Sequence, residues 1–261
     1  NGYHFRQNTV GVYNPFSVLM TFYKMDFGSY WFATGTPSYL VKLLKLSHYN
    51  MERLETERIT DKALNSIDAN PQNPIPVIYQ SGYLTIKGYN PEFKTYTLGF
   101  PNREVEEGFL DYLLPFYTDS IREGQAASCI EDLAIEIRSG KTDAFLRRLQ
   151  SLFAGIPYDN LKRDMEWHYQ STVFLVFRFL GFYVQKEYHT SQGRIDLLLQ
   201  TDKYIYMMEF KVDGTAEEAL AQINATNYAA QFATDPRKLF KVGVNFSNET
   251  KTIDRWVVEV R

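Results

Sequence analysis

The sequence predicts an α/β protein whose C-terminal part is a mixed sheet flanked by helices. Two observations support this fold class. Apolar runs within 158–261 follow the order helix, strand, hairpin, helix, strand, which favours a sheet covered on both faces. Residues 47–157 are mainly helical in pattern and contain two short alternating runs that predict a β-hairpin. We therefore expect a helical region followed by an α/β domain.

Composition sets the outer limits. The chain has 261 residues, enough for one large or two modest domains. Its 28 basic and 31 acidic side chains nearly balance, so a nucleic-acid-binding groove would have to be local. Cys129 is the single cysteine, which excludes an internal disulfide and a thiolate metal site. No apolar run approaches membrane-spanning length and no signal-peptide pattern is present, so we expect a cytoplasmic protein without membrane contact.

The region 47–157 contains several helical patterns and one hairpin. A charged sequence at Met51–Ile67 predicts a helix. It is followed by a predicted loop with three prolines at Asn70–Pro76. The runs Tyr83–Lys87 and Thr95–Phe100 predict a hairpin that turns at Gly88–Pro91. Helices followed by a hairpin are compatible with a winged-helix-like module. Further helices are predicted at Arg103–Tyr117, Gln125–Arg138 and Asp143–Phe153.

The only sequence that resembles a phosphate-binding loop is Ser139–Thr142. The first glycine of that motif would fall at Ile135, and no predicted strand precedes it, so the motif is incomplete. Gly140 instead predicts a helix stop and Thr142 a helix cap. The densest basic stretch is a candidate phosphate contact, with a solvated helix face as the alternative. It comprises Arg138, Lys141, Arg147, Arg148, Lys162 and Arg163.

The elements of 158–261 are predicted from caps and apolar runs. A helix is expected at Met165–Leu180, capped by Asp164 and stopped by Gly181. Strands are expected at Phe182–His189, at Leu239–Phe246 as a central strand, and at Arg255–Val260 as an edge strand.

The most informative stretch is Arg194–Lys211, which reads RIDLLLQTDKYIYMMEFK. Two runs rich in large apolar residues, Ile195–Gln200 and Tyr204–Phe210, flank polar residues and predict a hairpin. A two-residue loop at Asp202 and Lys203 would pair the residues on either side of it. This loop fixes the register of the whole hairpin.

Three charged side chains share one face of that hairpin. In the predicted register Asp196 lies opposite Glu209, with Cβ atoms roughly 4.5 to 5.5 Å apart. Lys211 joins Glu209 on the same face because side chains alternate along a strand. Burying these groups is costly without a compensating ion, and carboxylate oxygens are the ligands that Mg²⁺ and Mn²⁺ prefer. The pattern predicts metal-assisted phosphodiester hydrolysis, with Lys211 acting on the attacking water.

Asp196, followed after a strand-length gap by Glu209, Phe210 and Lys211, resembles the signature of the PD-(D/E)XK nuclease superfamily, although Ile195 stands where the name has Pro. The wider context GRIDLLL, MEFK and GTAEEALAQI is similar to the nuclease domain that follows a divergent AAA-type ATPase domain in many bacterial proteins. The resemblance implies a restriction-endonuclease-like sheet at 158–261. It also implies Mg²⁺ or Mn²⁺ bound by Asp196, Glu209 and the Phe210 carbonyl, and a nucleic-acid substrate, DNA.

Two further residues are candidates through the same resemblance. It implies that an acidic residue on the first helix, here Glu166, completes the metal site; the alternative is an acidic side chain favoured by the helix dipole. It also implies that Gln222 supports the site or contacts substrate; the alternative is a surface glutamine. Gln222 lies one turn beyond Glu218, which forms a predicted capping box with Thr215.

Residues 1–46 contain VYNPFSVL and YWFATGTPSYLVKLL, which resemble the end of the ATPase domain that precedes the nuclease in that family. Because the first residue is Asn1, we expect a fragment of a longer chain and an ATPase domain as a partner outside it. Two functions remain open at this point. One is a metal-dependent deoxyribonuclease, and the other is a catalytically silent module that binds nucleic acid or a protein for an associated ATPase. The sequence leaves the oligomeric state open.

Overall fold

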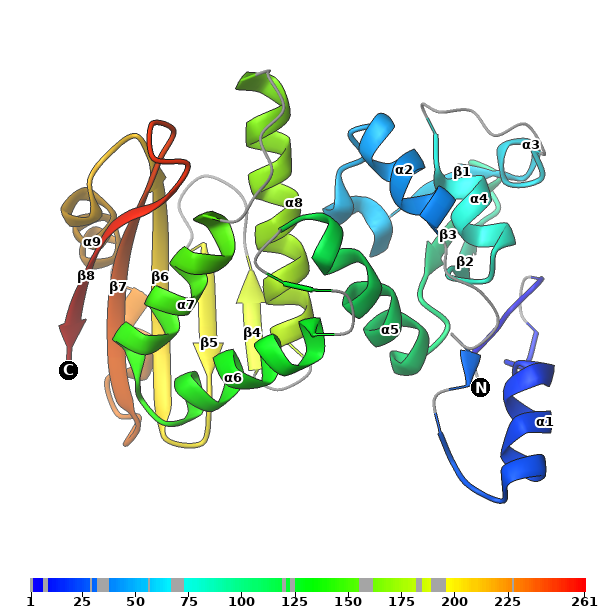
Figure 1. Ribbon diagram of the computed structural model, residues 1–261, viewed down its shortest axis with the longest axis horizontal. Coiled ribbons are helices and arrows are strands. Elements are labelled where there is room, and N and C mark those ends of the chain that lie inside the picture. The colour runs from blue at the N-terminus through cyan, green and yellow to red at the C-terminus, as the bar shows by residue number, and fades with distance from the viewer. Residues whose placement is uncertain are drawn as a thin grey trace. The chain divides into compact units, whose positions relative to one another are not determined.

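The computed structural model describes residues 2–6, 9–28, 30–31, 38–55, 57–66, 73–118, 121–122, 125–154, 162–181, 185–188, 196–226 and 228–261. The chain divides into two compact units (Figure 1). The first comprises Asn1–Phe116 and Asp159–Leu175, and the second comprises Tyr117–Tyr158 and Val176–Arg261. In the described part of the chain, no helix has the length and apolar character needed to cross a membrane.

The first unit combines helices with a three-stranded antiparallel sheet in the order β1-β3-β2. Its elements are α1 (Pro15–Lys24), α2 (Ser38–Leu46), η2 (Met51–Glu55), β1 (Arg58–Thr60), α3 (Asp61–Leu64), α4 (Ile75–Gln80), β2 (Thr85–Asn90), β3 (Thr95–Gly99), α5 (Arg103–Leu113) and η3 (Leu114–Phe116). From α2 onward the order helix, strand, helix, helix, strand, strand is compatible with the winged-helix-like module expected from the sequence. The predicted hairpin is confirmed, but its turn lies later than expected because β2 continues to Asn90 past an irregularity between Ile86 and Gly88.

The predicted helix at Met51–Ile67 is wrong. Of the described residues in this range, Met51–Glu55 and Asp61–Leu64 are helical, and β1 lies between them. Ile59 is buried within β1 and pairs with Tyr96 of β3, so the long-range pairing outweighs the local helical pattern. The predicted loop at Asn70–Pro76 also ends early, because α4 begins at Ile75. Pro76 is tolerated in the first helical turn, where its missing N–H leaves no bond unmade.

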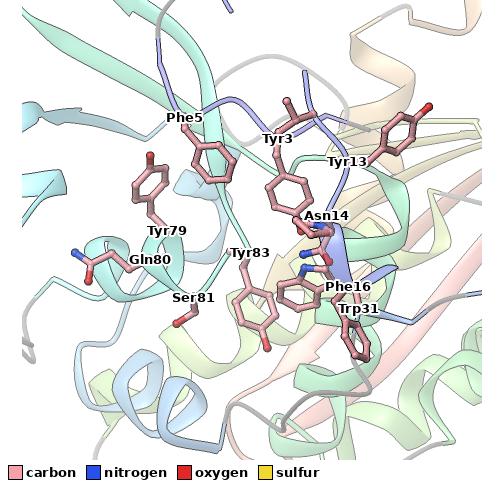
Figure 2. A pocket seen from close by; sticks show the side chains of 13 residues that line it. Tyr3, Phe5, Tyr13, Asn14, Phe16, Trp31, Tyr79, Gln80, Ser81 and Tyr83 are labelled. Carbon is pink, nitrogen blue, oxygen red and sulfur yellow. The ribbon is translucent and has the colours of Figure 1, made fainter. Parts of the chain in front are cut away.

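Aromatic side chains line a cavity of about 710 Å³ in the first unit (Figure 2). Tyr3, Phe16, Trp31 and Tyr83 contribute rings to its wall, and the rings of Trp31 and Tyr83 meet edge to face with centroids 4.6 Å apart. None of the described residues that line this cavity has a charged side chain. It therefore has a chemical character opposite to that of the charged hairpin.

The second unit contains a mixed five-stranded sheet in the order β4-β5-β6-β7-β8. Its elements are α6 (Ala126–Arg138), α7 (Thr142–Ala154), the end of α8 (Lys162–Leu180), β4 (Gln185–Tyr188), β5 (Leu197–Gln200), β6 (Tyr204–Val212), α9 (Ala216–Ala225), η4 (Tyr228–Phe232), β7 (Lys238–Ser247) and β8 (Thr252–Val260). β6 and β7 pair in parallel and the other neighbours are antiparallel. The predicted central strand and edge strand are confirmed as β7 and β8.

Helices cover both faces of this sheet, as predicted. On one face α9 contributes Ile223 to a buried cluster with Leu198, Ile205, Met207 and Leu239. α6 and α7 cover the other face (Figure 1).

Two contacts attach α6 and α7 to the sheet. The rings of Phe153 and Phe246 meet with centroids 4.9 Å apart. The buried Tyr206 hydroxyl donates a hydrogen bond to the Ile137 carbonyl at 2.7 Å. The compact unit that holds the sheet thus includes α6 and α7, although the sequence placed them in the preceding region 47–157.

The ends of α6, α7 and α8 agree with the predicted caps and stops, with two differences. Gly140 terminates α6 at φ 74°, and the Lys141 N–H donates to the Glu136 carbonyl at 2.9 Å. Thr142 is the first residue of α7 and not its cap. α8 begins at Lys162, so Asp164 lies inside its first turn and does not precede it.

Candidate metal centre

The β5–β6 hairpin has the register predicted from its loop. The Thr201 N–H donates to the Tyr204 carbonyl at 2.9 Å, which leaves a two-residue loop. The pairing runs from Gln200 with Ile205 to Leu197 with Met208. Continued by one residue, it places Asp196 opposite Glu209. Alternation of the ladder makes this a non-hydrogen-bonded pair, in which side chains approach most closely.

Each carboxylate is held by the backbone of the opposite strand. Asp196 Oδ2 accepts a hydrogen bond from the Phe210 N–H at 2.9 Å. Glu209 Oε2 accepts one from the Asp196 N–H at 3.4 Å. The N–H and C=O of a strand residue point to the same edge, so the Phe210 carbonyl is also directed to the β5 side of β6. Two carboxylates and one backbone carbonyl are therefore directed to one end of the hairpin.

Lys211 and Gln222 complete a connected polar group. The Gln222 side-chain nitrogen donates to Glu209 Oε1, and Lys211 Nζ donates to the Gln222 side-chain oxygen. Lys211 Nζ lies 3.9 Å from Glu209 Oε1. The amide thus presents its donor to the carboxylate and its acceptor to the ammonium, which is the orientation that satisfies both. The structure brings four of the predicted residues together.

The side chain of Glu166 lies outside the described residues, so its predicted place in the site stays a prediction. Its backbone belongs to α8. Of the candidate phosphate contacts, Arg148 pairs with Glu136 at 2.7 Å and with Asp132 at 3.1 Å. Arg148 therefore ties α7 to α6.

Burial dominates the electrostatics of this site. Glu209 is 3% exposed, and burial together with the nearby Asp196 raises its pKa to about 7. The Asp196 N–H, Lys211 and Gln222 act in the opposite direction. Burial also raises the pKa of Asp196, against the Phe210 N–H and Lys211. The surrounding protein groups thus do not fully compensate the negative charges of Glu209 and Asp196. Both carboxyls would ionise more readily beside a cation.

Sequence reasoning missed Gly243 of β7, which pairs with Glu209 in the parallel ladder. A Cβ atom at Gly243 would lie 2.1 Å from the Ala216 carbonyl oxygen and 2.6 Å from the Leu220 nitrogen. Only glycine lets α9 approach the sheet closely enough to place Gln222 over Glu209. The available signal was a glycine inside an otherwise apolar strand, which often marks a close backbone approach.

Sequence reasoning also missed Asn245, which pairs with Lys211 and is 5% exposed. Its Oδ1 accepts a hydrogen bond from the Gly214 N–H at 3.0 Å. Gly214 immediately precedes the capping box of Thr215 and Glu218, which is present as predicted. Asn245 therefore fixes the start of α9 relative to the sheet.

The donor set suits a hard divalent cation. Asp196, Glu209 and the Phe210 carbonyl offer oxygen atoms only, and Mg²⁺ commonly uses one or two carboxylates together with waters and substrate phosphate. Within the described ranges, no group of three or more His, Cys, Asp and Glu side chains gathers in metal-binding geometry. The described residues thus present two carboxylates here, held by backbone N–H groups of the hairpin.

Comparison with known proteins gives the class of this domain. Residues 164–256, which include the hairpin, α9 and β7, match the family model of the PD-(D/E)XK nuclease superfamily. This match identifies a PD-(D/E)XK nuclease superfamily domain in the C-terminal part of the chain, where the sequence resemblance had placed it. Residues 1–46 lie outside the match.

A curated relative extends the similarity over the whole chain. It is described as an uncharacterized protein in the vnfD 5′ region of Azotobacter chroococcum mcd 1. The two are 32% identical over 272 residues, which cover 99% of this chain and 51% of the relative. The chain therefore spans about half the length of the curated relative that it matches. No solved structure matches the chain.

Proposed function

We propose that this chain is a divalent-metal-dependent nuclease that hydrolyses DNA phosphodiester bonds. The observation that supports it most directly is the connected group of Asp196, Glu209, Lys211 and Gln222 at one end of the hairpin. The family match to 164–256 supports the same class of activity. We further propose a bacterial, cytoplasmic setting in which the nuclease serves an ATPase domain.

Asp196 and Glu209 would hold Mg²⁺ or Mn²⁺ together with the Phe210 carbonyl, and Glu166 is a candidate further ligand. When bound, the metal supplies Lewis-acid polarisation of the phosphoryl oxygen and lowers the pKa of water. The Phe210 N–H holds the Asp196 carboxylate in place at 2.9 Å. Gln222 orients Glu209 through its side-chain amide.

Lys211 would act on the attacking water and the phosphate. Its side chain is 32% exposed, so the ammonium reaches solvent while Gln222 holds it beside Glu209. In the proposed reaction a water oxygen bonds to phosphorus and the bond from phosphorus to the leaving nucleotide oxygen breaks. The attacking water loses a proton to solvent, and the leaving oxygen takes up a proton from solvent to become a hydroxyl. A positioned cation beside the phosphoryl oxygens stabilises the charge that develops there.

The second candidate is a catalytically silent module that binds nucleic acid or a protein partner for the associated ATPase. The observation that favours it is the Gln222 amide, which bonds to both Glu209 and Lys211 and so connects the charged groups through protein contacts. On this alternative the hydrogen bonds among Glu209, Lys211 and Gln222 stabilise the packing of α9 on the sheet and bind no metal.

Calorimetry with Mn²⁺ on the wild type and on Asp196→Ala tests the proposal, with cleavage of single- and double-stranded DNA and of RNA assayed in the same preparations. The matched control is Asp202→Ala, an exposed aspartate in the loop of the same hairpin. We expect binding and DNA cleavage in the wild type and the control, and loss of both in Asp196→Ala. A wild-type protein that neither binds Mn²⁺ nor cuts would establish the silent module.

A further inference from the structure

The second unit ends in an open sheet edge. Among the described residues β8 pairs with β7 alone, and Figure 1 shows β8 at the outer border of the sheet. The strand runs for nine residues, Thr252–Val260, and contains no proline. A long edge strand presents a row of unpaired N–H and C=O groups that can pair with another chain.

The hydrogen-bond pattern shows which residues face outward. Arg261 and Leu239 exchange both backbone hydrogen bonds, at 2.9 and 3.2 Å. Hydrogen-bonded and non-hydrogen-bonded pairs alternate in an antiparallel ladder, so Arg255, Val257 and Glu259 direct their backbone groups toward β7. The alternate residues of the regular part of the strand, Trp256, Val258 and Val260, direct theirs to the open edge.

We propose that two copies of the chain associate through β8, antiparallel and centred on Val257, so that their sheets become continuous. In this register Trp256 exchanges backbone hydrogen bonds with Val258 of the second copy. Arg255 lies opposite Glu259 of the second copy in a non-hydrogen-bonded pair, where side chains come closest.

The charged side chains of β8 favour this register over the registers centred on the adjacent residues. Centring the pairing on Val258 places Arg255 opposite Arg261 of the second copy, which sets like charges together. Centring it on Trp256 places Arg255 opposite Val257, which leaves the charge without a partner across the interface. Only the arrangement about Val257 forms two symmetric ion pairs.

The charges within each copy extend these pairs. Arg255 binds Glu217 of α9 at 2.7 Å, and Lys241 binds Glu259 at 2.7 Å. Across the interface the order becomes Glu217, Arg255, Glu259, Lys241, in which every neighbour has the opposite charge. On the other face Val260, which is 48% exposed, would lie beside the second strand. The face of the edge that carries Arg255 and Glu259 is therefore complementary to itself in charge, while on the other face Val260 lies opposite Asp254 of the second copy.

In the dimer the two proposed metal sites would lie at a fixed separation, a consequence that rests on the proposed function. Glu209 pairs with Gly243, and Gly243 pairs with Val257, so Glu209 lies in the same row as the symmetry axis. Five strand spacings of about 4.8 Å put the two Glu209 residues roughly 24 Å apart. A single edge is smaller than the roughly 1,200 to 2,000 Å² buried in stable specific interfaces, so the association is reversible.

Sedimentation velocity of the full chain in EDTA, without metal or nucleic acid, tests the dimer independently of catalysis. We expect a concentration-dependent dimer in the wild type and in Asp196→Ala. Arg255→Glu alone and Glu259→Arg alone are each expected to weaken self-association at least tenfold, because each places like charges opposite one another. An equimolar mixture of the two variants restores both ion pairs and is expected to recover the dimer.

Cross-linking tests the register. In a Cys129→Ala background, Val257→Cys is expected to oxidise readily to a covalent dimer, because opposed residues in a non-hydrogen-bonded pair have Cα atoms about 4.5 Å apart. Val258→Cys is the matched control and is expected to cross-link far less. A monomer at every concentration, a mixture that stays monomeric, or cross-linking through Val258→Cys in preference would each overturn the proposal.

Discussion

Replacing the buried Glu209 by Gln is expected to stabilise the metal-free protein at neutral pH. Burial raises the pKa of Glu209 from 4.5 to about 7 in the folded chain. Between those values the folded state binds more protons than the unfolded state, so the free energy of unfolding falls as the pH rises through this window. At roughly 1.4 kcal/mol per unit of pH, the full interval corresponds to about 3 kcal/mol.

Glu209→Gln keeps the side-chain length and an oxygen that can accept from Gln222, while it removes the charge. We expect the variant to exceed the wild type in unfolding free energy by about 3 kcal/mol at pH 8, with little difference at pH 4.5. The same variant should lose Mn²⁺ binding. This combination is typical of a site whose groups are arranged for a ligand at the expense of stability.

Urea titrations in EDTA between pH 4.5 and pH 8, followed by circular dichroism, measure this difference. The matched control is Glu249→Gln, which alters an exposed glutamate in another Glu-x-Lys sequence and is expected to show no pH-dependent gain. The reasoning would be refuted if Glu209→Gln were no more stable than the wild type at pH 8, or if its gain were the same at both ends of the pH range.

Three further outcomes are expected. Mn²⁺ affinity should rise about tenfold per unit of pH up to about 7 and then level off, because the metal must displace a proton from Glu209; calorimetry that found no proton release below pH 7 would contradict this. Gly243→Ala should displace α9, lower stability by roughly 1 to 3 kcal/mol and weaken Mn²⁺ binding, since its Cβ would lie 2.1 Å from the Ala216 carbonyl oxygen; unchanged binding would show that α9 does not position the site. Tyr206→Phe should lower stability by about 1 kcal/mol through loss of the hydrogen bond to the Ile137 carbonyl while leaving Mn²⁺ affinity unchanged, and a change in affinity would indicate coupling between the two faces of the sheet.

The sequence by itself determined the features that depend on local interactions. The loop at Asp202 and Lys203 and the two-residue period of the strands were enough to place Asp196 opposite Glu209. The capping box of Thr215 and Glu218 fixed the start of α9, and Gly140 fixed the end of α6. Each of these depends on residues close together in the chain, so the pattern that encodes them can be read directly.

Tertiary contacts decided the rest. Ile59 forms a strand because its partner Tyr96 lies far along the chain, and no local pattern reports that pairing. The close approach at Gly243 brings Gln222 to Glu209, and the surrounding core, not the glutamate itself, raises the pKa of Glu209. Burial and long-range packing depend on which surfaces meet in the folded chain, so the charged hairpin was predictable while its ionisation and its support by α9 were not.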